Sequence, residues 1–158
     1  MKVYLDTNII SRYTDLKVSE KAALAYRLLA EKQEVRLVTS SKAKQELERT
    51  SDPVRKAFLA SLYELFGKIS DRIGEVSGCW GSARLGTTPF GGGRVDPTLQ
   101  GLREIFEPDD AWHIFLAVKD GCDYFLTLDE KTILSPVRTH SHTIASLCGK
   151  MRFVSPEE

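Results

Sequence analysis

The feature of the sequence that most constrains its fold is an alternation of short β-prone segments with longer helix-prone ones. Residues 2–5, 35–39 and 123–128 are apolar or β-branched runs of strand length, and residues 151–154 are expected to form a last short strand. Strands that alternate with helices predict a parallel, doubly wound sheet. We therefore expect one α/β domain over residues 1–158, a parallel-sheet α/β/α sandwich.

Two helices are predicted in the first third of the chain. Residues 18–32 place apolar side chains on one helical face and contain neither Gly nor Pro. Ser40 and Ser41 can cap a second helix, which carries Glu46. Residues 6–8 are expected to form a turn or a helix cap.

Three more helices are predicted further along. Pro53 fits the first turn of a helix that runs through Phe66. Helical periodicity returns at Asp109, and Gly121 is in the usual position just past a last helical turn. A weaker helix is expected at residues 143–147.

The segment from 67 to 108 differs in composition, because it holds nine of the eleven glycines. Its first third is expected to extend a helix through Ile69, Ile73 and Val76. Residues 78–101 are predicted to be a glycine-rich loop or lid inserted in the domain. A loop of that length in a compact domain is either functional or disordered.

Four acids from distant parts of the sequence are expected to meet at one edge of the sheet. They are Asp6, Glu46, Asp110 and Asp129, and each follows a predicted strand or lies near the start of a helix. In parallel α/β sheets, sites form outside the carboxyl ends of the strands, where the following helices also begin. A single acid at such a position is often only a helix cap or a partner of the helix dipole. The joint placement of all four favours a common site.

Carboxylates gathered at one edge need a counter-charge. At ~4 Å, like charges repel by several kcal/mol at an effective dielectric constant of ~20. Mg²⁺ or Mn²⁺ would relieve this repulsion, since both prefer oxygen ligands. Such an ion can activate water and stabilise charge on a scissile phosphate. The acids therefore predict metal-dependent phosphate chemistry.

Four stretches of the chain, at residues 3–10, 40–47, 110–117 and 122–129, carry a resemblance to a known family. Their sequences VYLDTNII, SSKAKQEL, DAWHIFLA and CDYFLTLD resemble, in order, the four motifs of PIN-domain ribonucleases, especially the VapC-type toxins of toxin–antitoxin pairs. The resemblance covers most of the chain outside residues 67–108.

This resemblance implies a Mg²⁺- or Mn²⁺-dependent endoribonuclease with the four acids as metal ligands. It also implies RNA as substrate, an antitoxin protein as a partner, and a homodimer. Thr7, Asn8 and Thr127 match family positions that help to hold the acids or water. The glycine-rich middle segment departs from the family pattern, so a particular RNA target or antitoxin does not carry over.

Other polar residues allow two interpretations each. His113 lies one helical turn after Asp110. It is interpreted either as a supporting contact of the site or as a partly buried packing histidine. His140 and His142 flank Ser141 in a predicted loop and are interpreted as solvated.

The middle segment contains three arginines, Arg84, Arg94 and Arg103, together with aromatic residues. Such a set can bind phosphates and stack on bases. A lid or a dimer contact is the alternative.

Bulk composition constrains partners and compartment. Lys plus Arg and Asp plus Glu are 22 each, so any surface for nucleic acid must be local. Cys79, Cys122 and Cys148 form no C-x-x-C pair and are interpreted as free thiols of a reducing cytosol. Asp6 comes too early for a signal peptide. No apolar run reaches the ~20 residues of a membrane span, so we expect a cytoplasmic protein without membrane contact.

Two other functions remain open. A non-catalytic PIN-like binding module could use the same acidic edge to receive Arg or Lys from a partner. A phosphatase or phospho-acceptor domain could use Asp6 as nucleophile, although Asn8 replaces the second acid of the usual D-x-D pattern.

Overall fold

A computed structural model describes residues 1–12, 34–69 and 96–156 of the chain. Five strands of these residues form one sheet in the order β3-β2-β1-β4-β5. Every pairing in it is parallel. The strands are β1 (Lys2–Leu5), β2 (Arg36–Ser40), β3 (Gly67–Ile69), β4 (Tyr124–Leu126) and β5 (Arg152–Val154). The parallel α/β fold expected from the alternation of elements is confirmed.

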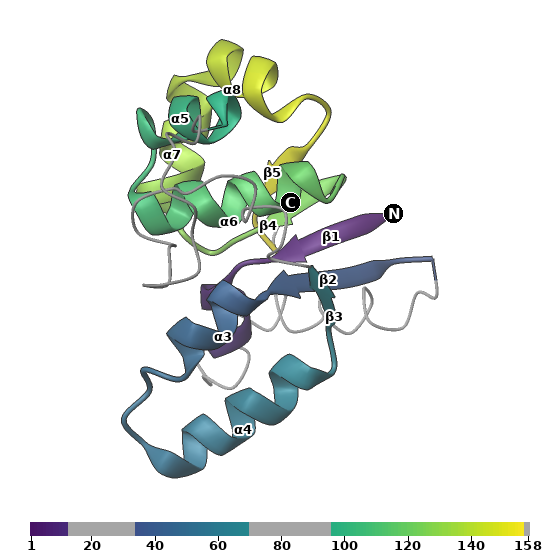
Figure 1. The fold of residues 1–158 in the computed structure, drawn as a ribbon, viewed down its shortest axis with the longest axis vertical. Helices are drawn as coiled ribbons and strands as arrows, with labels where there is room; N and C mark the ends of the chain where they lie inside the picture. The colour runs from purple at the N-terminus through teal and green to yellow at the C-terminus, as the bar shows by residue number, and fades with distance from the viewer. Residues whose placement is uncertain (13–33, 70–95, 157–158) are drawn as a thin grey trace, which may run out of the picture.

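Helices cover both faces of this sheet (Figure 1). One layer contains α1 (Thr7–Arg12), α3 (Ser41–Leu47) and α4 (Pro53–Glu64). The other contains α5 (Pro97–Arg103), α6 (Pro108–Lys119), α7 (Ser135–Thr139) and α8 (Ser141–Cys148). A short π-helix, η2 (Glu130–Leu134), leads directly into α7.

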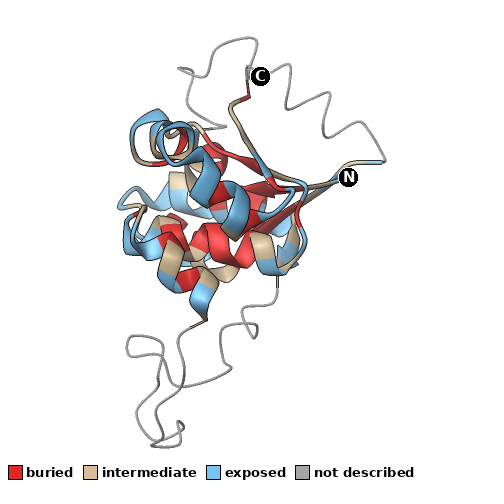
Figure 2. Ribbon diagram, turned by 90° about the horizontal axis from the view of Figure 1, so that it is seen from above, coloured by how far each residue is buried: buried red, intermediate tan, exposed pale blue. Residues whose placement is uncertain are grey.

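The alternation of side chains along β1 explains why two cores form. Val3 and Leu5 point into one cluster with α1, α3 and α4, whereas Tyr4 points into the other with α5, α6 and α8. The Tyr4 ring stacks on that of Phe125, with 5.1 Å between their centroids. Figure 2 shows the buried residues gathered around the sheet, with exposed residues on the outer helix surfaces. Full burial of each large apolar side chain stabilises the fold by about 1.5–3 kcal/mol.

Helix ends follow the local sequence signals. Asp52 caps α4 by accepting from the N–H groups of Val54 and Arg55, and Pro53 occupies the first turn as predicted. Gly121, just past the end of α6, has a φ of 66°, which L side chains rarely adopt. The predicted strand at residues 2–5 is confirmed, and so are the predicted helices that begin near Pro53, Asp109 and residue 143.

Three sequence-based expectations are wrong. Ile69 belongs to strand β3, not to a helix, because residues 67–69 pair with the end of β2. Gly101 lies in helix α5, not in a loop. Asp96 caps this helix, and Leu147 of α8 packs so closely that a Cβ at position 101 would come within 2.8 Å of it. Ser141 and His142 begin α8 rather than lying in a loop.

Other expectations lie outside the described residues. These are the helix at 18–32, the helical extension through Ile73 and Val76, and most of the insertion at 78–101. Among the residues that the structure does describe, no helix is long and apolar enough to cross a membrane.

The thiols of Cys122 and Cys148 are free and buried, and burial raises the pKa of each to about 12. Because the thiolate is the reactive form, both should react slowly with iodoacetamide at pH 8. In a Cys79→Ser variant, labelling followed by mass spectrometry should show at least a 100-fold slower reaction in buffer than in urea, on the order expected for neutral, buried thiols. Equal rates in the two conditions would contradict this packing.

Candidate metal centre

The candidate acids lie where the strand order of the sheet reverses. The chain runs outward from β1 through β2 to β3, then returns to place β4 on the other side of β1. Ligand sites of open α/β sheets form at such a point, beyond the carboxyl ends of the strands. Asp6 follows β1 directly and Asp129 follows β4 by three residues. Asp6 also continues the sheet ladder, because its N–H donates to the carbonyl of Leu126 at 3.1 Å.

Asp6 is buried and fully surrounded by hydrogen-bond donors. Its Oδ1 accepts from the backbone N–H of Thr7 at 2.7 Å. Its Oδ2 accepts from Asn8 Nδ2 and Thr127 Oγ1, each at 2.7 Å. Burial raises the pKa of Asp6, although the charge of His113 and these hydrogen bonds act against the rise.

Asn8 and Thr127 connect the two segments that leave the sheet here. Asn8 Nδ2 also donates to Thr127 Oγ1 at 3.0 Å, and Asn8 Oδ1 accepts from the N–H of Leu128 at 3.0 Å. Thr127 Oγ1 accepts in turn from the N–H of Asp129 at 3.0 Å. These contacts fix the backbone that carries Asp6 and Asp129.

Glu46 is the half-buried end of a hydrogen-bonded network near the carboxyl ends of the strands. Glu46 Oε1 lies 3.1 Å from His113 Nε2, and His113 Nδ1 lies 2.6 Å from the Tyr4 hydroxyl. Tyr4 donates to Ser40 Oγ at 2.8 Å, and the same oxygen caps α3 by accepting from Ala43 N. The network thus joins the end of β2, the helix that carries Glu46 and the helix that carries Asp110.

Both ring nitrogens of His113 are occupied within the protein. With Tyr4 donating to Ser40, the Nδ1–H of His113 donates to Tyr4 and its Nε2–H donates to Glu46. When the ring is neutral, Tyr4 can turn its proton to Nδ1 while Nε2 keeps its own. His113 therefore donates to Glu46 in either form, and neither nitrogen is left for a metal ion.

Electrostatics favours the charged form of this pair. Burial alone would lower the pKa of His113, but the hydrogen bond to Glu46 and the charges of Asp6 and Glu46 raise it. Burial likewise opposes ionisation of Glu46. The hydrogen bond and the charge of His113 outweigh it, so the pKa of Glu46 is below its ordinary value.

Asp110 and Asp129 are joined by Thr132, a residue that sequence reasoning missed. Its hydroxyl donates to Asp110 Oδ2 at 2.9 Å, and its N–H donates to Asp129 Oδ1 at 2.7 Å. The spacing of Asp129 and Thr132 is that of a helix cap and could have suggested the second contact. Nothing in the sequence indicates the first, which spans 22 positions.

The position of Asp110 makes its ionisation unfavourable. Burial raises the pKa of Asp110 to about 6, and the charges of Asp6 and Asp129 contribute, against the hydrogen bond from Thr132. The neighbouring Asp109 differs, because it is exposed and forms an ion pair with Lys42 at 2.8 Å. Of these two acids, only Asp110 has a pKa that is raised by the charges of other candidate acids.

The four acids share one edge and act on one another, but they do not converge on a single point. Besides burial, the charges of Asp6 and Asp129 raise the pKa of Asp110, and the charge of Glu46 raises the pKa of Asp6. Within the described residues, no three Asp, Glu, His or Cys side chains are gathered closely enough to hold a metal ion. Each carboxylate is instead bonded to neighbouring donors.

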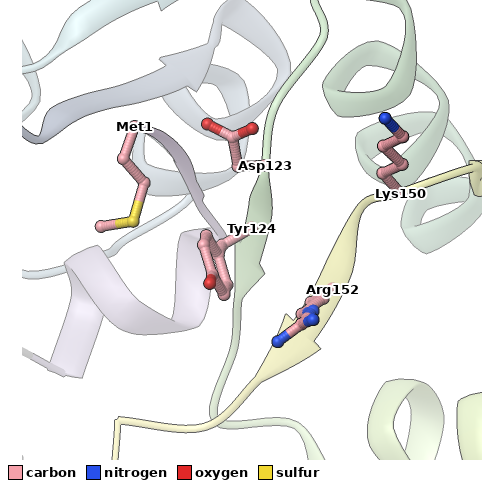
Figure 3. A pocket seen from close by; sticks show the side chains of 5 residues that line it. All are labelled: Met1, Asp123, Tyr124, Lys150 and Arg152. Atoms are coloured by element: carbon pink, nitrogen blue, oxygen red, sulfur yellow. The ribbon is translucent and has the colours of Figure 1, made fainter.

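Among the remaining candidates, Arg84 and Arg94 lie outside the described residues. Arg103 is exposed at the end of α5. A cavity of about 380 Å³ lies at the opposite edge of the sheet, near the amino ends of β1, β4 and β5 (Figure 3), and contains none of the four acids. It is lined by Met1, Asp123, Tyr124, Lys150 and Arg152.

Comparison with known proteins supports the fold. No family model matches the sequence, and no curated protein matches it. The structure is similar to a chain in the crystal structure of VapBC2 from Rickettsia felis bound to a DNA fragment from their promoter. The two chains are 9% identical, the match covers 98% of each, and the TM-score is 0.55. The two chains share a fold. This likeness alone assigns no activity.

Proposed function

We propose that this protein is a Mg²⁺- or Mn²⁺-dependent endoribonuclease whose site is formed by Asp6, Glu46, Asp110 and Asp129. The observation that carries the proposal is that these acids lie at one edge of the sheet, where the strand order reverses, close enough to act electrostatically on one another. Holding carboxylates together in a half-buried place is unfavourable without a counter-charge. Perturbed carboxyl groups of this kind are typical of functional sites.

The chemistry of the four side chains suits a hard divalent cation, although no three of them are gathered closely enough to hold one in the described residues. All four side chains offer carboxylate oxygen, which Mg²⁺ and Mn²⁺ prefer. The hydroxyl oxygen of Thr7 is buried and makes no hydrogen bond of ordinary geometry among the described residues, although it lies close enough to the Glu46 carboxyl to help lower the pKa of Glu46. Such a hydroxyl near Glu46 suits a water molecule of a hydrated ion.

The surrounding residues would orient the ligands. A bound cation lowers the pKa of water and stabilises charge on the phosphate. Asn8 and Thr127 hold Asp6 at Oδ2, and His113 holds Glu46 at one oxygen. Because both nitrogens of His113 are occupied, we assign it no proton transfer to the substrate.

We further propose RNA as the substrate and a small antitoxin as the partner. The four motif resemblances support this, together with the shared fold of a chain from the VapBC2 assembly. On the same resemblance, we propose that the protein is the toxin of a toxin–antitoxin pair and forms a homodimer. Co-expression with a neighbouring small reading frame should give a stable complex in which RNA cleavage is suppressed.

A second candidate is a non-catalytic PIN-like module that binds a basic segment of a partner at the acidic edge. The observation that favours it is that no three ligating side chains converge among the described residues. This module would form complexes without turnover, and divalent cations would not strengthen them.

Metal removal separates the two candidates. Purified protein incubated with single-stranded RNA and Mn²⁺ should cleave the RNA at internal positions, and EDTA should abolish cleavage until Mn²⁺ is added back in excess. Gel analysis of end-labelled RNA provides the measurement. Cleavage that persists in EDTA would point to a contaminating metal-independent ribonuclease. Absence of cleavage with both Mg²⁺ and Mn²⁺ would favour the binding module.

A further inference from the structure

Thr132 contacts two candidate acids with two different groups. Its N–H donates to Asp129 and its hydroxyl donates to Asp110. Asp110 lies in the first turn of α6, whereas Asp129 follows β4, so a single residue joins two separate elements. The contact with Asp110 is made by the side chain alone and can be removed without changing the backbone.

The π-helix η2 places Thr132 between these acids. The N–H of Leu134 donates to the carbonyl of Asp129, five residues earlier, at 3.0 Å. This turn is one residue wider than an α-helical turn, and such turns are frequent at functional sites. The next two side chains, Ile133 and Leu134, are only 1% and 4% exposed. Ile133 belongs to the core cluster that contains Tyr4, and Leu134 is buried beside it in sequence, so the wide turn that carries Thr132 is anchored.

Within the described residues, the two hydrogen bonds occupy only one oxygen of each carboxylate. Thr132 occupies Oδ2 of Asp110 and Oδ1 of Asp129. The other oxygen of each group accepts no hydrogen bond from a described residue. Groups that hold one oxygen of a ligating carboxylate set the orientation of the other, and their loss weakens metal binding about 10–100-fold.

We propose that Thr132 is a positioning residue that orients Asp110 and Asp129 toward a shared divalent cation. The inference rests on the proposed metal-dependent function. It adds Thr132 to Asn8, Thr127 and His113 as a residue that contacts neither cation nor substrate and acts through the acids.

Two substitutions test the role of the hydroxyl. Thr132→Val keeps the shape of the side chain and the N–H bond to Asp129 but removes the bond to Asp110. Thr132→Ser restores the hydroxyl. Thr139→Val in α7 is a matched control, because among the described residues the Thr139 hydroxyl bonds only to the carbonyl of Ser135. Binding of Mn²⁺ alone, followed by electron paramagnetic resonance of the free ion, measures the effect without any need for turnover.

The expected result is a rise of about tenfold or more in the Mn²⁺ dissociation constant for Thr132→Val, with Thr132→Ser and Thr139→Val close to the unaltered protein. Cleavage by Thr132→Val should recover largely at saturating Mn²⁺, since the lost group acts on metal affinity. If Thr132→Val does not fold, Thr132→Ala is compared with Thr132→Ser in the same way.

Three results would count against the proposal. Unchanged Mn²⁺ affinity in folded Thr132→Val overturns it, and so does a Thr132→Ser variant as weak as Thr132→Val, because packing would then be responsible. If the unaltered protein binds Mn²⁺ and cleaves RNA, either result leaves the proposed function intact. If the unaltered protein does not bind Mn²⁺, both the proposed function and this inference fail.

Discussion

Asp6→Asn is expected to lower the rate of RNA cleavage by about a thousandfold, equivalent to roughly 4 kcal/mol of transition-state stabilisation. The substitution removes a charge from the centre of the acidic group. It also reverses a hydrogen-bond pattern, because every described hydrogen-bond partner of this carboxylate donates to it. Whichever way the amide is turned, its NH₂ meets either Thr7 N–H or the NH₂ of Asn8. Single-turnover cleavage at saturating Mn²⁺ is the measurement.

The stability of the same variant should change much less. Unpaired donors near position 6 cost about 1–3 kcal/mol, but burial raises the pKa of Asp6, so loss of the charge is a compensating gain. Asp123→Asn is the matched control, since Asp123 lies at the opposite edge and also accepts a backbone N–H, that of Lys2. Full activity in Asp6→Asn would remove this residue from the proposed site. Loss in both variants would indicate a general effect on folding.

The parts of the fold that could be predicted are those with strong local signals. Pro53 and the positive φ of Gly121 mark helix ends that depend on a few neighbouring residues. Strand β3 could not be predicted in the same way, because its three residues become a strand only by pairing with β2. Gly101 was wrongly predicted to lie in a loop, because glycine favours loops. Here it lies in α5 and allows this helix to pack closely on α8.

The candidate site shows the same limit. The topology of a parallel sheet is enough to place the acids at one edge, because strand ends and helix starts meet there. The orientation of each carboxylate depends on partners that are distant in sequence. Tyr4 meets His113 across 109 positions, and Thr132 meets Asp110 across 22. No local pattern specifies such contacts. The sequence could therefore predict that the acids share one edge of the sheet, but not whether their carboxylates point to one common position.

The contribution of Asp110 to the stability of the metal-free protein is expected to fall as the pH rises from about 4 to about 6. Folding raises the pKa of Asp110 from 3.8 to about 6, so its stabilising contribution is fully present below pH 3.8 and is lost as the pH rises through 6. A shift of about two units corresponds to roughly 3 kcal/mol, and partial exposure of the carboxyl reduces this to about 1–2 kcal/mol. The raised pKa values of Asp6 and His113 act with the same sign.

Asp110→Asn should therefore make the metal-free protein more stable at pH 8 by about 1–2 kcal/mol while reducing cleavage about a hundredfold or more. The amide oxygen can still accept from Thr132, but the charge that repels Asp6 and Asp129 is gone. Urea unfolding in EDTA at pH 5 and pH 8 is the measurement, with Asp109→Asn as a control that should show neither effect, because Asp109 pairs with Lys42 outside the group. Mn²⁺ should stabilise the unaltered protein at pH 8 and leave Asp110→Asn nearly unchanged. An acid that is kept to bind a cation destabilises the metal-free protein. If Asp110→Asn were less stable than the unaltered protein at pH 8, Asp110 would instead stabilise the fold, and the prediction would be wrong.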